Sequence, residues 1–76
     1  MPFDPKYIQK IIEEGIPGSK VFVEDLVGDG DHLSATVVAE QFRGQKLLAQ
    51  HQIVYGVLKD ILKDQLHALK LKTSAP

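Results

Sequence analysis

The spacing of apolar residues along the chain predicts two amphipathic helices. In the first, apolar residues recur at helical intervals after Asp4 and Pro5 and before Gly15. Aspartate caps the free N–H groups at a helix start, proline at the first helical position has its φ already set, and glycine is a common helix end. We therefore expect a helix over residues 5–15. Its expected apolar face is formed by Tyr7, Ile8, Ile11 and Ile12.

The second predicted helix is longer and lies within residues 42–62, where Phe42-Arg43-Gly44 turns the chain into it. Its apolar stripe has the period of an α-helix and also carries His51, while Lys59 and Lys63 lie away from it. Gly56 lies near the middle, and because glycine weakens a helix, the pattern fits either one continuous helix or a short helix followed by another. The expected stripe consists of Leu47, Leu48, Val54, Tyr55, Leu58, Ile61 and Leu62.

Alternating apolar and polar residues between the two helices predict two strands, over residues 20–27 and 32–40. Because a short Gly/Asp stretch separates them, we expect an antiparallel hairpin. The first strand is expected to place Val21, Val23 and Val27 on one face and Phe22, Glu24 and Leu26 on the other. The second is expected to turn Leu33, Ala35, Val37 and Ala39 inward.

A third strand is predicted after the second helix, over residues 66–72. Leu69 and Leu71 are expected to face inward, with Lys70 and Lys72 outside. The last four residues, 73–76, offer little to pack and are expected to fray.

A GxxG stretch, Gly15-Ile16-Pro17-Gly18, lies between the first helix and the first strand. The same spacing forms the phosphate-holding loop of KH nucleic-acid-binding domains. In those domains the loop joins two helices, whereas here it joins a helix to a strand, and Pro17 lacks an N–H donor. We interpret the stretch as a turn, since these residue types are common in turns.

The predicted element order is α-β-β-α-β, or α-β-β-α-α-β if the second helix is broken. This order indicates an α+β two-layer sandwich in which a small sheet packs on helices. The length of 76 residues allows one domain, which we place at residues 1–76.

Composition removes several classes of function. The absence of cysteine excludes disulfides, nucleophilic thiols and thiolate metal ligands from this chain. No apolar run reaches the roughly 20 residues that a membrane span needs, and no secretory leader is visible, so we expect a soluble cytoplasmic protein. The formal charge of −1 argues against a strong phosphate-binding surface overall. Because GxSxG, HExxH and Walker motifs are all missing, we predict that the protein is not an enzyme.

The three histidines are the candidate ligands. His67 lies at the entry of the third strand, where one ring nitrogen could face a ligand, or where the ring could be half-buried with backbone hydrogen bonds. His32 closes the hairpin loop and is either a ligand or a residue at the strand edge. His51 lies among apolar residues on the helical stripe, which favours a packing role over ligation.

The cations of the second half of the chain form a second group of candidates. Positive side chains are usually solvated, but if they gather on one surface they could bind an acidic partner or phosphate. The residues considered for such a surface are Arg43, Lys46, His51, Lys70 and Lys72.

An ordered set of residues resembles the BolA family. It consists of Phe42-x-Gly44-x-x-Leu47-Leu48-x-x-His51-x-x-Val54-Tyr55, followed by Leu66-His67-Ala68-Leu69-x-Leu71-x-Thr73. The match covers nearly the whole chain, including the Val23-Glu24-Asp25 strand and the loop at 28–32. The resemblance implies a three-stranded sheet packed on helices, similar to class II KH domains, and it alone places the third strand in the sheet.

The resemblance also implies a function. BolA proteins pair with monothiol glutaredoxins and share or transfer a [2Fe-2S] cluster in iron-sulfur and iron homeostasis. By this resemblance His67 is a cluster ligand, and a Cys or His in the loop at 28–32 supplies a second one. His32 matches either that ligand or a different family histidine that stands just before the second strand. Glutaredoxin and glutathione would supply the sulfur, so the chain alone is expected to hold no cluster and to be a monomer or weak homodimer.

The resemblance leaves a second function open, that of a nucleic-acid-binding transcriptional regulator in a stress response. The net negative charge and the position of the GxxG stretch argue against it. So do Gln50 and Gln52, which flank His51 where the family usually has basic residues. A protein-interaction module without metal is the third alternative.

Overall fold

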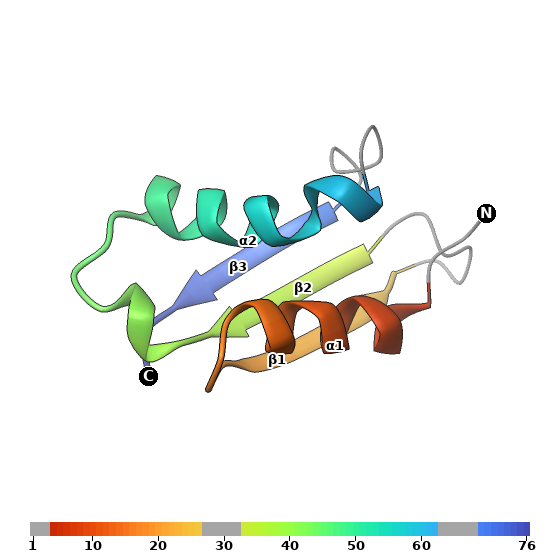
Figure 1. Ribbon diagram of the computed structural model, residues 1–76, viewed down its shortest axis with the longest axis horizontal. Coiled ribbons are helices and arrows are strands. Elements are labelled where there is room, and N and C mark those ends of the chain that lie inside the picture. Colours follow the sequence, from red (N-terminus) through yellow and green to blue (C-terminus); the bar gives the residue numbers. More distant parts are fainter. Residues whose placement is uncertain (1–3, 27–32, 63–68) are drawn as a thin grey trace.

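The computed structural model describes residues 4–26, 33–62 and 69–76 of the chain, which form two layers. A three-stranded sheet makes one layer, and the two described α-helices lie together on one face of it (Figure 1). The elements are α1 (Pro5–Gly15), β1 (Lys20–Asp25), β2 (Leu33–Val38), the 3₁₀ helix η1 (Glu40–Phe42), α2 (Leu47–Leu62) and β3 (Leu69–Ser74). The α+β sandwich is as predicted, whereas the likeness to class II KH domains stays a prediction.

The strands lie in the order β1-β2-β3. β1 and β2 are antiparallel, from Lys20 opposite Val38 to Asp25 opposite Leu33, which confirms the predicted hairpin pairing. β2 and β3 are parallel, with Leu33 opposite Leu69. A parallel pair needs a long crossover connection, and α2 provides it.

The start of α1 is as the sequence predicts. The Asp4 carboxylate accepts a hydrogen bond from the backbone N–H of Lys6 at 3.0 Å, and proline occupies the first helical position. Ile8 and Ile12 are fully buried, but Tyr7 is 53% exposed, so its predicted place on the apolar face is wrong. Tyr7 is turned about 100° around the helix from Ile8, away from the row that meets the sheet.

The turn after α1 confirms the interpretation of the GxxG stretch. The N–H of Ser19 donates to the carbonyl of Ile16 at 3.1 Å, and Gly18 has φ of 80°. Proline followed by a glycine with positive φ is typical of a type II turn. The Gln41 side chain donates to the carbonyl of Pro17 at 2.7 Å, which ties this turn to η1.

Gly15 ends α1, as predicted, and it is also a packing position. A Cβ atom at this residue would lie 2.6 Å from Cγ1 of Val57 on α2. Valine is stiff at χ1 in a helix, so Val57 cannot easily turn aside. The missing side chain therefore permits the close approach of the two helices.

α2 begins after the turn that the sequence predicts at residues 42–44. Phe42 belongs to η1 and is 1% exposed, and Gly44, with φ of 79°, turns the chain before the helix starts at Leu47. Leu47 and Leu48 are 60% and 70% exposed, so their predicted burial is wrong. They form the first turn of α2, before the row of residues that faces the sheet begins.

The buried row of α2 starts at Gln50 and continues with Val54 and Leu58, one residue per helical turn. Gln50 is a polar residue in the core, and its amide nitrogen donates to the carbonyls of Gln45 at 3.0 Å and Phe42 at 3.4 Å. It therefore fastens the start of α2 to the segment before it. The helix is continuous through Gly56, so the predicted alternative of a break there is wrong.

The strands confirm the predicted alternation and extend the last one. Along β2, Leu33, Ala35 and Val37 are buried beneath the helices. β3 continues to Ser74, whose carbonyl accepts a hydrogen bond from the N–H of Ala39 at 3.0 Å. Thr73 pairs with Val37, so the expected fraying is wrong for residues 73 and 74. The described core is Ile8, Ile12, Ile16, Val21, Leu33, Ala35, Val37, Ala39, Phe42, Val54, Leu58 and Leu69.

The contact between Gly15 and Val57 leads to a prediction about stability. Gly15→Ala should lower the free energy of unfolding by about 1–2 kcal/mol, because the added methyl overpacks the helix contact. Gly56→Ala is the matched control, since a Cβ there meets nothing within 4 Å. It should raise stability by about 0.5–1 kcal/mol through helix propensity. Urea unfolding measures both, and equal shifts for the two variants would contradict the packing role.

Candidate functional site

One end of the sheet brings together distant parts of the sequence. Leu33 and Leu69 are partners in the parallel pair, so β2 and β3 begin at the same end (Figure 1). Asp25 pairs with Leu33, so β1 ends there too. Leu33 and Leu69 are both buried, which anchors these strand starts in the core. Neighbouring strands lie about 4.8 Å apart, so the starts of β2 and β3 are immediate neighbours.

The two predicted ligands adjoin these strand starts in the sequence. His32 directly precedes Leu33, and His67 stands two residues before Leu69. Both histidines lie outside the described residues, so their roles as ligands stay predictions. Within residues 4–26, 33–62 and 69–76, no three residues among His, Cys, Asp and Glu come together in a way that could hold a metal ion.

His51, the third histidine, packs within the helical layer. It is half-buried on α2, and its ring meets Tyr55 edge-on, with 6.2 Å between centroids and 79° between planes. Its Nε2 atom is buried and has no hydrogen-bond partner among the described residues. These contacts favour the packing role over ligation.

Arg43 is already engaged by a neighbour. Its guanidinium makes a two-pronged ion pair with Glu40, with Nε–Oε1 at 2.7 Å and Nη2–Oε2 at 3.2 Å, and also donates to the carbonyl of Pro76 at 3.1 Å. The hydrogen bond and then the charge of Arg43 lower the pKa of Glu40, and Glu40 raises the pKa of Arg43 in return. Both side chains are exposed, so the pair adds little stability.

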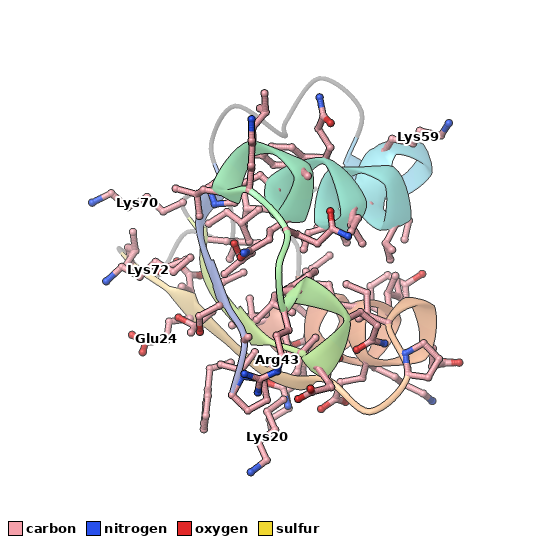
Figure 2. All side chains as sticks on the ribbon, turned by 90° about the vertical axis from the view of Figure 1, so that its left-hand side faces the viewer. Lys20, Glu24, Arg43, Lys59, Lys70 and Lys72 are labelled. Carbon is pink, nitrogen blue, oxygen red and sulfur yellow. The ribbon has the colours of Figure 1, made fainter. Side chains whose placement is uncertain are left out.

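The five residues considered for a partner surface do not come together. Lys70 and Lys72 extend from β3 on the outer face of the sheet, away from the helices (Figure 2). Arg43 and Lys46 lie in the connection between η1 and α2, and His51 lies within the helical layer. Only the two lysines of β3 share a face.

A residue without a predicted role stands out on that outer face. Phe22 is 71% exposed, although it is a large aromatic side chain. The alternation along β1 had placed it opposite Val21 and Val23, but it had given no reason for an aromatic residue there. In the sequence, Phe22 could have been singled out because it is an aromatic residue at a strand position that faces outward.

The fold by itself defines a class of protein. It is a small two-layer α+β domain with an antiparallel hairpin and a third, parallel strand added through a crossover helix. Neither described helix combines the length and hydropathy required to cross a bilayer. The sequence model of the family described as BolA-like protein matches residues 15–76, so the chain belongs to the BolA-like family. This confirms the resemblance seen in the sequence.

A relative from Rickettsia prowazekii matches over nearly its full length. The uncharacterized protein RP812 is 36% identical over 73 residues, which cover 96% of this chain and 95% of the relative. Its solved NMR structure superimposes with a TM-score of 0.76 at 34% identity and covers 100% of this chain and 99% of that one. The fold is therefore shared along the whole domain.

Two relatives carry functional names. The acid stress protein IbaG of Escherichia coli K12 is 31% identical over 70 residues, covering 91% of this chain and 80% of IbaG. The DNA-binding transcriptional regulator BolA of Vibrio cholerae is 39% identical over 46 residues, covering 60% of this chain and 43% of the regulator. Neither name is that of an enzyme.

The ion pair of Arg43 can be tested by titration. Arg43→Gln removes both the hydrogen bond and the charge that lower the pKa of Glu40, so the pKa of Glu40 should rise toward the ordinary 4.5. Carbon-detected NMR of the Glu40 carboxyl across the acid range measures this change. Lys46→Gln is the control, since Lys46 has no part in the pair. An unchanged titration in Arg43→Gln would refute the assigned contact.

Proposed function

We propose that the protein is an adaptor that pairs with a monothiol glutaredoxin to share or transfer a [2Fe-2S] cluster, with His67 as a cluster ligand. The observation that supports this is the parallel pairing of Leu33 with Leu69. Two strand starts that are far apart in the sequence become neighbours, and each is preceded within two residues by a histidine. Each strand start therefore has a histidine close to it in the sequence.

The composition of the chain fits a cluster shared with a partner better than a cluster bound by this chain alone. Iron-sulfur clusters are held mainly by thiolates, and this chain has no cysteine. The glutaredoxin and its glutathione would therefore supply sulfur, while His67, with His32, supplies nitrogen. Replacing thiolate by imidazole raises the potential of a cluster. The cluster is cargo in this proposal, so the chain alone holds none.

The buried anchors of the strand starts also suit a ligand-presenting role. Leu33 and Leu69 are 3% and 7% exposed, so the first residue of each strand is held by the core. Ligands supported by a packed scaffold lose less freedom when they bind. In this proposal the chain supplies nitrogen ligands next to the sheet, and the partner supplies the remaining ligands.

A second candidate function is that of a DNA-binding transcriptional regulator. The name of the Vibrio cholerae relative favours it. A gel shift with duplex DNA at physiological salt separates the candidates, because the adaptor requires glutaredoxin and no DNA. Retarded duplex at low micromolar protein would support the regulator.

The adaptor is tested by mixing the protein with a cluster-loaded monothiol glutaredoxin and following the visible absorption spectrum. The wild type should shift the spectrum of the cluster, because imidazole replaces one of its ligands. His67→Ala should abolish most of this shift. His51→Gln is the matched histidine control, since His51 packs against Tyr55, and it should behave as the wild type.

Two outcomes would contradict the adaptor. An identical spectral shift in His67→Ala and wild type would remove His67 from the ligand set. Binding of glutaredoxin by the wild type without any spectral shift would instead leave a protein-interaction module that takes no part in holding the cluster. Circular dichroism of each variant shows whether it is folded.

A further inference from the structure

The outer face of the sheet carries a regular arrangement of side chains. Outward residues of neighbouring strands form cross-strand rows, and the middle row contains Phe22, Thr36 and Lys72. The flanking rows are Glu24, Ser34 and Lys70 on one side and Lys20, Val38 and Ser74 on the other. An aromatic ring, hydroxyl groups, amines and one carboxylate therefore share the outer face of the sheet.

Neither described helix covers this surface. Both lie on the opposite face, and Figure 2 shows Lys70, Lys72 and Glu24 projecting away from them. Phe22 remains 71% exposed, whereas Val21, its neighbour on the inner face, is 4% exposed. An exposed aromatic side chain on an open sheet offers a face on which a flat ligand can stack.

The face is also locally positive. Its charged residues are Lys20, Lys70 and Lys72 with the single carboxylate of Glu24, although the chain as a whole has a formal charge of −1. The ion pair found among the described residues joins Arg43 to Glu40 and involves none of these lysines. The three amines are thus available to a negatively charged ligand.

We propose that this outer face binds single-stranded RNA. In this arrangement the ring of Phe22 stacks on one unpaired base, and Lys70 and Lys72 contact the adjoining phosphates. The Thr36 hydroxyl lies between the ring and Lys72 in the sheet register, and Ser34 lies beside Lys70 in the next row, so both can hydrogen-bond the ribose 2′-OH. Stacking on an aromatic residue of an open sheet, with basic residues along the backbone, is a common mode of single-strand recognition.

The dimensions of the face suit a short single strand. Three strands about 4.8 Å apart and six residues long at about 3.3 Å each give a platform of roughly 10 by 17 Å. A few nucleotides fit it. Duplex DNA keeps its base faces stacked inside, so it would leave Phe22 without a partner.

The test is fluorescence anisotropy of a labelled single-stranded RNA of about eight nucleotides, within the usual site sizes for such surfaces. Phe22→Leu keeps an apolar residue but removes the aromatic face, and it should weaken binding about tenfold. Lys70→Gln with Lys72→Gln should reduce the slope of log affinity against log salt by about 1.4, since each lost phosphate contact removes about 0.7. Lys59→Gln is the charge control, because Lys59 projects from α2 away from the sheet (Figure 2).

The same assay defines the results that overturn the proposal. Absence of RNA binding at low salt would do so, as would equal affinities of wild type, Phe22→Leu and the double lysine variant. Single-stranded DNA bound as tightly as RNA would contradict a role for the ribose hydroxyl. A polyglutamate peptide that binds better than RNA, and is insensitive to Phe22→Leu, would assign the face to an acidic protein. None of these measurements needs glutaredoxin or a cluster, so they are independent of the adaptor function.

Discussion

The structure depends on one geometric constraint: two helices must bury one whole face of a three-stranded sheet. The inward residues of β2 are fully or almost fully buried because α1 and α2 lie side by side over them. The absence of a side chain at Gly15 allows this close spacing, since Val57 occupies the place where a methyl group would be. A chain of 76 residues has no further helix for the second face among its described elements. The same constraint therefore makes the core and leaves the outer face in solvent.

The crossover through α2 determines where the candidate sites lie. It returns the chain so that β3 runs parallel to β2, and the starts of the two strands meet at one end of the sheet. It also presents Lys70 and Lys72 on the same face as Phe22, which lies two strands away on β1. One topological feature thus separates two possible binding regions, the strand ends and the open face. Each can be altered by substitutions that leave the core intact.

Local chemistry and the alternation of side chains were enough to predict much of this fold. The cap at Asp4, the turn at Pro17 and Gly18, and the inward residues of β2 depend on interactions within a few residues or across one hairpin. Other features depend on where a distant element ends. Tyr7, Leu47 and Leu48 have helical spacing, but whether they are buried depends on the extent of the sheet beneath them. The continuation of β3 to Ser74 likewise requires β2 as its neighbour.

The candidate site was less predictable than the fold. Pattern alone left His67 with two interpretations, and the prediction that it is a ligand came from the family resemblance. The ion pair of Arg43 with Glu40 follows from the 3₁₀ turn of η1, which periodicity did not indicate. The alternation along β1 predicted which face Phe22 lies on. That this face is exposed became clear only because both described helices lie on the other face.

Gln50 shows how a polar residue in a small core can fix the position of a neighbouring segment. A leucine at this position would offer more apolar surface, but it would leave the carbonyls of Phe42 and Gln45 without the amide that now serves both. Hydrogen bonds in a water-poor interior are directional, whereas apolar contacts tolerate sliding. The amide thus selects a single angle at which the chain enters α2. α2 leads the chain toward β3. A change in the direction in which the chain enters α2 would therefore displace the far end of the helix, which lies toward the end of the sheet where we propose that glutaredoxin and its cluster bind.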